Sequence, residues 1–164
     1  MQIGVSGHQT RPAIDWHWVA RVVRSELAKA GEVAKALTSL APGSDQVFAN
    51  AAISLGIPVV AVLPLEGYER YFQGEGLADY RRLLGRCEQI QLGWKGEPER
   101  AFFEAGKFIV DSCDVLFAIW DGAASEGLGG TADIVDYALA KSRRIIHINP
   151  IAKKVTRGVK SSGR

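Results

Sequence analysis

Apolar residues in this chain occur as short continuous runs that alternate with longer segments in which they recur every three or four positions. The run at residues 115–120 is typical of a strand buried on both faces of a parallel sheet. Further runs predict strands at 2–6, 33–40, 57–63, 87–92 and 144–148. Segments with helical spacing cover 16–30, 44–55, 77–86, 98–112 and 131–141. Six strands alternating with helices predict an α/β fold, a doubly wound and mostly parallel sheet with helices on both faces.

A glycine-rich loop follows the strand predicted at residues 115–120. It contains Gly122, Gly129 and Gly130, and Thr131 is the expected N-cap of the next helix. Backbone N–H groups at a helix N-terminus carry partial positive charge, and glycines let an anion approach the backbone closely. The sequence therefore predicts that a phosphate or carboxylate binds at the N–H groups of residues 129–131.

Two acidic residues in the same loop suggest what else this ligand carries. Asp121 and Glu126 lie beside the predicted anion site, where their carboxylates would accept hydrogen bonds from ribose hydroxyls. Trp120 or Tyr68 would then lie near a base. This combination predicts a nucleotide-type pocket. The alternative is that the glycines serve only a tight turn between strand and helix.

The loops after the first and second predicted strands add polar groups at the same edge of the sheet. The candidate ligand-binding residues in them are Gly7, His8, Arg11, Ser39, Gly43, Ser44 and Asp45. Ser44 is the expected N-cap of its helix, and the planar guanidinium of Arg11 matches phosphate or carboxylate. For His8 and Arg11 the alternative is a structural role, binding a carbonyl or a surface acid. Because parallel strands end at one edge, we expect a single composite pocket.

Charge is distributed unevenly along the chain. The 164 residues include 20 basic and 18 acidic side chains, a net charge of +2. Residues 151–164 hold five basic residues and no acid, so 15 basic side chains face 18 acidic ones in residues 1–150. We expect one domain over 1–150 and a basic, flexible tail over 151–164. The acidic body argues against a nucleic-acid-binding surface, which is usually basic.

The sequence contains no signal for a membrane segment, a metal site or a cofactor. No apolar run approaches the roughly 20 residues that a membrane-spanning helix needs, and residues 2–6 predict a strand rather than part of a signal peptide. Cys87 and Cys113 lack metal-ligand spacing and are expected to be buried as small apolar residues. We expect a cytoplasmic protein without metal or cofactor.

Three blocks of the sequence carry a family resemblance. They are Gly-Val-Ser-Gly-His-Gln at 4–9, Ser-Leu-Ala-Pro-Gly-Ser-Asp-Gln at 39–46, and Cys-Asp-Val-Leu at 113–116 with Trp-Asp-Gly at 120–122 and Gly-Gly-Thr-Ala-Asp at 129–133. Together they resemble the SLOG superfamily, which groups the DprA-type Rossmann domain, the LOG (lysine-decarboxylase-like) phosphoribohydrolases and related nucleotide-ligand sensors. The resemblance covers residues 3–149. It implies a Rossmann-like sheet that binds a nucleotide or nucleotide-derived ligand, and it leaves a homo-oligomer open.

The chain departs from the LOG motif at the residue that assists catalysis. LOG enzymes carry P-G-G-x-G-T-x-x-E, in which the Glu three residues after Thr assists cleavage of an N-glycosidic bond. Here Thr131 matches the Thr, but Ile134 stands at the Glu position. Asp133 points about 100° away from that position around the helix. An enzyme of this type would use Glu126 or Asp133 as its carboxylate and His8 as its proton donor.

Three functions are compatible with these residues, and one of them is enzymatic. The leading hypothesis is a non-catalytic domain that binds a small nucleotide-type ligand and acts as a sensor. The first alternative is a LOG-type phosphoribohydrolase acting on a nucleoside monophosphate. The second is a DprA-like module that binds single-stranded DNA or another protein. The missing Glu favours binding over hydrolysis, and the acidic body makes nucleic acid the less favoured partner.

Overall fold

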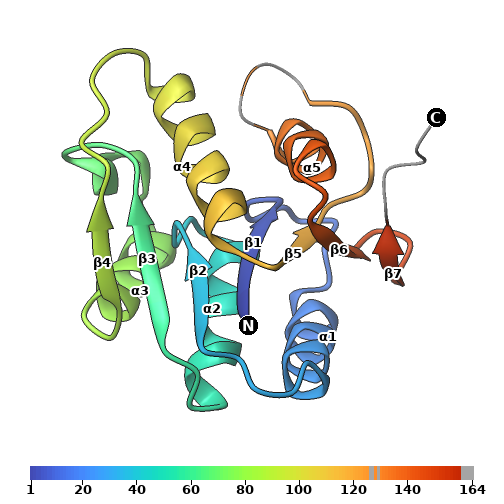
Figure 1. Cartoon of the computed structure of the whole chain (residues 1–164). Helices are drawn as coiled ribbons and strands as arrows, with labels where there is room; N and C mark the ends of the chain where they lie inside the picture. Colours follow the sequence, from blue (N-terminus) through green and yellow to red (C-terminus); the bar gives the residue numbers. More distant parts are fainter. Residues whose placement is uncertain (126–127, 129, 160–164) are drawn as a thin grey trace.

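A single sheet of seven strands organises the chain (Figure 1). The computed structural model describes residues 1–125, 128 and 130–159. The strand order is β4-β3-β2-β1-β5-β6-β7, and every neighbouring pair is parallel except β6 and β7. The strands are β1 (Gln2–Gly7), β2 (Lys35–Thr38), β3 (Val59–Leu63), β4 (Glu88–Gln91), β5 (Val115–Ile119), β6 (Arg144–Asn149) and β7 (Lys154–Val159). This confirms the predicted doubly wound α/β fold.

Helices cover both faces of the sheet (Figure 1). They are α1 (Trp16–Lys29), α2 (Ser44–Ser54), α3 (Gly74–Leu84), α4 (Pro98–Ser112) and α5 (Thr131–Ala140), with a short 3₁₀ helix η1 (Tyr68–Tyr71). The first three pack on one face, and α4 and α5 pack on the other. The central strand β5 serves both layers, because Phe117 faces α2 whereas its neighbour Leu116 faces α4 and α5. Burial on both faces explains its uninterrupted apolar run.

The starts of the helices follow the predictions only in part. Asp15 caps α1 as predicted, with its Oδ1 accepting a hydrogen bond from the Trp18 N–H at 3.1 Å. Ser44 and Thr131 are not N-caps, which corrects the prediction. They are the first residues of α2 and α5, and the N-caps are glycines that supply no side-chain hydrogen bond. Both helices therefore begin without a capping side chain of their own.

The segment after residue 150 is ordered beyond the predicted domain boundary. Lys154–Val159 form β7, which pairs antiparallel with β6, so six strands was one too few. Arg157 Nε donates to Glu26 Oε2 at 3.0 Å, and Lys153 Nζ lies 3.0 Å from Asp15 Oδ2. The predicted tail thus includes a strand that is fastened to α1 by charge. Polar residues dominate β7, which is why hydrophobic patterning missed it. Residues 160–164 lie outside the described residues.

Two further expectations concern single side chains. Cys113 is buried as predicted, and burial raises the pKa of its thiol to about 11. Cys87 is only half-buried. Tyr68, one of two candidates for a base contact, is buried instead in an aromatic cluster with Phe72 and Tyr80, with ring centroids 4.8 and 5.7 Å away. Its role is packing of η1 onto the body.

Candidate functional site

The candidate site lies where β1 and β5 end side by side. These strands are neighbours in the sheet although more than 100 residues separate them in sequence. From β1 the chain proceeds outward through β2, β3 and β4, and from β5 it proceeds the other way through β6 and β7. The loops after β1 and β5 therefore diverge, and a crevice opens between them. This is the topological switch point at which open α/β sheets bind ligands.

Two adjoining hollows make up this crevice. The inner cleft, of about 290 Å³, is lined by residues that include Ser6, His8, Ser39, Asp45, Phe102 and Ile134. The outer cleft, of about 310 Å³, is lined by residues that include His8, Arg11, Trp120, Asp121, Ser125 and Ala132. His8, Gly130 and Thr131 belong to both and form the wall between them. A larger hollow of about 540 Å³ beside η1 lies apart from these residues.

Most of the predicted site residues meet here. Gly7, Ser39 and Asp45 line the inner cleft, and Arg11, Trp120 and Asp121 line the outer one. Three further predicted site residues lie in the described part of the chain but line neither cleft: Gly43, Ser44 and Gly122. Glu126 and Gly129 lie outside the described residues.

Close packing joins the loop after β1 to the start of α2. The Ser44 hydroxyl and N–H both donate to the His8 carbonyl, at 2.7 and 3.0 Å. A Cβ on Gly7 would lie 2.5 Å from Ser44 Oγ and 2.6 Å from the Ile119 carbonyl. Gly43 has φ of 96°, and a Cβ there would lie 2.7 Å from the backbone of Gln9. These residues shape the site rather than contact a ligand. The polar groups of Ser44 bond to His8, and neighbouring atoms fill the space beside both glycines.

The most perturbed carboxyl of the site is Asp45, in the first turn of α2. It accepts backbone hydrogen bonds from Ala41, with N–Oδ2 of 3.2 Å, and from Ser39. Burial raises the pKa of this carboxyl to about 7, more than the two hydrogen bonds lower it. Asp45 therefore populates both protonation states near neutral pH. The sequence predicts Asp45 in the pocket but contains no signal for this titration.

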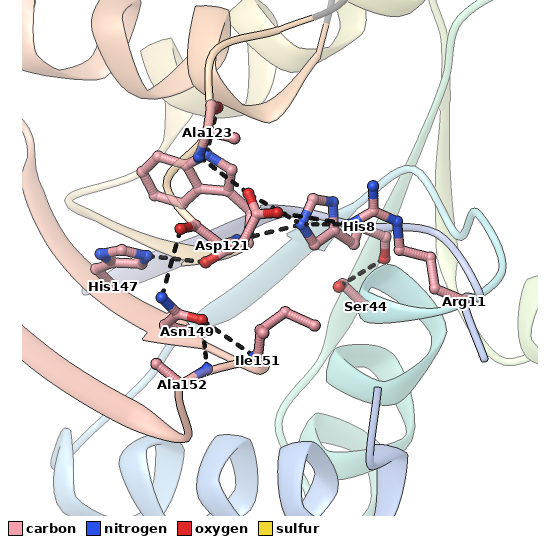
Figure 2. A network of polar contacts seen from close by, with 10 residues as sticks. His8, Arg11, Ser44, Asp121, Ala123, His147, Asn149, Ile151 and Ala152 are labelled. Atoms are coloured by element: carbon pink, nitrogen blue, oxygen red, sulfur yellow. Dashed lines mark hydrogen bonds and ion pairs between the residues drawn. The ribbon is translucent and has the colours of Figure 1, made fainter. Parts of the chain in front are cut away.

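His8, Arg11 and Asp121 form a cluster in the outer cleft (Figure 2). His8 Nε2 accepts the Asp121 N–H at 3.1 Å and lies 3.2 Å from Arg11 NH1. Burial, and then the nearby Arg11, lower the pKa of His8. Its imidazole is consequently neutral at pH 7, with Nε2 as an acceptor, and this nitrogen is poorly suited to the proton-donor role considered above.

Several neighbouring groups stabilise the negative charge of the Asp121 carboxylate. Its Oδ1 accepts the Ala123 N–H at 2.9 Å, and its Oδ2 lies 3.7 Å from Arg11 NH1. The Ala123 hydrogen bond, followed by His8 and Arg11, holds the pKa of Asp121 below its usual value, so it is ionised at neutral pH. Gly122, with φ of 85°, makes the turn that this hydrogen bond closes.

Residues from β6, which sequence analysis missed, fasten the loop after β5 (Figure 2). The His147 ring packs on Trp120 at a centroid distance of 4.3 Å, and its Nε2 lies 2.9 Å from the Trp120 carbonyl. Trp120 Nε1 donates to the Ala123 carbonyl at 3.0 Å. Asn149 Nδ2 donates to the Asp121 carbonyl at 3.4 Å. Trp120 therefore has one face covered and its N–H engaged, which limits what it offers to a base.

The N-terminus of α5 faces the clefts. Ser125 Oγ accepts the Asp133 N–H at 3.2 Å, and Gly130 is required beside it because a Cβ there would lie 2.5 Å from Ser125 Oγ. The first N–H groups of a helix have no partner within it. Thr131 and Ala132, the first two residues of α5, line the outer cleft.

Of the two carboxylates considered for catalysis, Asp133 belongs to the described residues and Glu126 does not. Ile134, 2% exposed, lines the inner cleft from α5 together with Thr131, and it stands at the position that carries Glu in the LOG motif. Asp133 is not among the described residues that line either cleft. In the described part of the chain no three His, Cys, Asp or Glu side chains are placed to hold a metal ion. No helix within that part is long and apolar enough to cross a membrane.

Comparisons with known proteins identify the fold. No protein-family model and no curated protein matches the sequence. DprA from Helicobacter pylori, described as binding single-stranded DNA, superposes with a TM-score of 0.63 at 14% identity over 90% of this chain and 64% of its own. DprA from Streptococcus pneumoniae gives 0.61 at 16% identity over 89% of this chain. A molybdenum cofactor binding protein from Rippkaea orientalis gives 0.55 at 20% identity over 90% of this chain and 76% of its own.

These likenesses define the class of fold. All are SLOG-type Rossmann-like structures, so the fold implied by the three sequence blocks is confirmed. The chain spans about half of the S. pneumoniae DprA, 49% of its length.

Proposed function

We propose that this chain binds a nucleotide or nucleotide-derived ligand without hydrolysing it, with the phosphate at the N-terminus of α5. The observation that carries the proposal is that Thr131 and Ala132, the first residues of α5, line the outer cleft together with Arg11. Backbone N–H groups and the helix dipole attract an anion together. A planar guanidinium adds charge-assisted hydrogen bonds to phosphate oxygens.

Asp121 supplies the group that distinguishes a sugar phosphate from a free phosphate. Its carboxylate is ionised beside the anion site, and Arg11, 3.7 Å away, offsets its charge. An ionised carboxylate accepts hydrogen bonds only, which suits ribose hydroxyls. The similarity to a DNA-binding and a cofactor-binding protein agrees with ligand binding by this fold, although those ligands are properties of those proteins.

Binding is favoured over N-glycosidic hydrolysis by the inner cleft. Its α5 wall presents Ile134 where the LOG motif has Glu, and the imidazole of His8 is neutral with Nε2 already accepting. A hydrolase needs a carboxylate beside the sugar and a proton donor at the leaving base. The Glu position of the motif provides no such carboxylate here, because it holds Ile134.

The test is to incubate the protein with nucleoside monophosphates, NAD, ADP-ribose and cyclic dinucleotides, and to analyse retained and released compounds by chromatography. Intact ligand retained on the protein is the expected result. Accumulation of free base with time would refute the proposal and favour the phosphoribohydrolase alternative. Retention of single-stranded DNA at physiological salt, without any small nucleotide, would replace it by the DNA-binding alternative.

The Arg11→Ala variant tests the location of the phosphate. Loss of a charge-assisted hydrogen bond of about 1.5–3 kcal/mol predicts binding weaker by about 10- to 150-fold in titration calorimetry. The matched control is Arg86→Ala, an exposed arginine just before β4 at the opposite edge of the sheet, which should leave affinity unchanged. Equal affinities for the two variants would exclude the outer cleft as the phosphate site.

A further inference from the structure

We propose that the inner cleft holds the base of the ligand and that the Asp45 carboxyl, in its protonated form, hydrogen-bonds to that base, so that binding takes up a proton. This inference rests on the proposed phosphate site and specifies the rest of the ligand. The sequence predicted the base near Trp120 or Tyr68, whereas this inference places it in the inner cleft, across the wall formed by His8, Gly130 and Thr131.

The position of the base follows from the shapes and surfaces of the two clefts. Trp120 has His147 against its ring and its N–H bonded to Ala123, so it is a poor platform for a base. The inner cleft adjoins the phosphate site directly, because Thr131 lines both hollows. Its walls include the Phe102 ring and apolar side chains such as Ile109. Polar residues such as Ser39 and Asp45 share the lining with these apolar side chains. Apolar walls with a few placed polar groups suit a flat heteroaromatic ring that has polar edges.

Asp45 is the carboxyl placed to contact such a ring. It lines the inner cleft, and the backbone N–H groups of Ala41 and Ser39 fix the orientation of its carboxyl by donating hydrogen bonds to it. Leu40, between these two residues, is fully buried with φ of 60°, a conformation that non-glycine residues rarely adopt. The loop is therefore held in a strained form that directs both N–H groups at Asp45.

The charges around Asp45 favour its neutral form. Burial already places the pKa near 7. From η1, Tyr68 interacts with it electrostatically and is itself uncharged, because burial and Asp45 raise the tyrosine pKa. From the loop after β1, the neutral His8 lines the same cleft. Among the described residues that line the inner cleft there is no Lys or Arg. A bound base would displace water without supplying a cation, which shifts Asp45 further toward the acid.

The sign of the pH dependence follows. If only protonated Asp45 binds the base, the apparent affinity scales with the protonated fraction of the free protein. With a pKa of about 7 that fraction is nearly complete at pH 6. It falls to about one tenth at pH 8, so the contribution of the base weakens by roughly tenfold over this interval. Ligand binding should be strongest below pH 7 and be lost as the pH rises.

The experiment compares ribose 5-phosphate with AMP, GMP, CMP and UMP by titration calorimetry at pH 6, 7 and 8. All five carry a monoester phosphate with a similar second pKa, so the ratio of affinities cancels the titration of the phosphate and reports the base. We expect the affinity of the best nucleotide to exceed that of ribose 5-phosphate at least tenfold at pH 6. At pH 8 this ratio of affinities should be about tenfold smaller than at pH 6. Parallel titrations in buffers of different ionisation enthalpy should show proton uptake at pH 7.

Asp45→Asn separates recognition from a structural role. Asparagine keeps one donor and one acceptor but does not titrate, so the preference for the nucleotide should persist and become independent of pH. Should this variant fail to fold, proton uptake by the unmodified protein still decides the question. Ribose 5-phosphate bound as well as every nucleotide, or a ratio unchanged between pH 6 and 8, would overturn the inference and leave the phosphate site intact. Absence of binding by all five probes would overturn both.

Discussion

Replacing Gly106 by alanine adds a methyl group to the wall between α4 and the inner cleft. An ideal Cβ at this position lies 2.3 Å from Ile134 Cδ1 and 2.9 Å from Ile134 Cγ1. Forcing a methyl group into a filled space typically costs about 1–3 kcal/mol, whereas alanine in a helix interior gains about 1 kcal/mol over glycine. We therefore expect Gly106→Ala to lower the free energy of unfolding by about 1 kcal/mol.

The neighbouring side chain offers a test of the cause. Ile134→Ala alone should cost about 2–5 kcal/mol, because it leaves a cavity in the α4–α5 layer. It also removes both atoms that collide with the added methyl group. In this background Gly106→Ala should become stabilising by up to about 1 kcal/mol, since only the helix propensity and the filled space remain. The sign of the same substitution reverses between the two backgrounds.

The assay is equilibrium unfolding in urea for the four proteins of this cycle, read by circular dichroism. Gly85→Ala is the matched control, since its Cβ would meet only ordinary contacts of 3.7 and 3.8 Å and its φ is negative. It should have the same effect with Ile134 or with alanine at that position. Coupling of 0.5–3 kcal/mol is expected for residues in contact. If Gly106→Ala destabilises both backgrounds equally, the steric explanation is wrong.

Two further substitutions test the base site and the strand β7. Phe102→Ala should weaken the best nucleotide by about 5- to 150-fold, corresponding to about 1–3 kcal/mol of base stacking, and leave ribose 5-phosphate unchanged in calorimetry; equal losses for both probes would contradict a base in the inner cleft. Among the described residues, Arg157→Ala leaves the carboxylate of Glu26, 5% exposed, with only the weaker partner Lys29 at 3.9 Å. Because Arg157 is itself largely exposed, we expect a loss of about 1–3 kcal/mol rather than the 3–5 of a fully buried pair. Urea unfolding measures it, and Lys153→Ala, which breaks the exposed pair with Asp15, should cost at most about 1 kcal/mol. Equal effects of the two would show that β7 does not depend on the buried carboxylate.

Hydrophobic patterning was sufficient for the layered sheet because burial on two faces leaves an unmistakable trace in sequence. β5 is apolar at every position and β3 likewise. Both were predicted as strands, and the one that became β5 was predicted to be buried on both faces. β7 carries no such trace. It is a polar edge strand that depends on pairing with β6 and on the Arg157–Glu26 contact across 131 residues. Interactions of that separation cannot be read from local periodicity.

The candidate site divides in the same way. In the sequence, each loop of the site lies between a strand and the N-terminus of a helix. This pattern alone predicts that Gly7, Asp45, Asp121 and Thr131 lie at one edge of the sheet, because parallel strands end together. Which groups remain available was decided by tertiary contacts. Ser44 is used by the His8 carbonyl, Trp120 is covered by His147, and both caps fall on glycines.

The sequence by itself thus determined the layers of the fold, the edge at which its loops gather and the residue types found there. Only the tertiary structure decided how these residues are used. The lowered pKa of His8 follows from burial and from Arg11, which outweigh the opposing charge of Asp121 on the loop after β5. The raised pKa of Asp45 follows from the walls that enclose it. Hydrogen bonding and desolvation depend on distances between segments far apart in the chain, and a linear pattern of residues does not contain those distances.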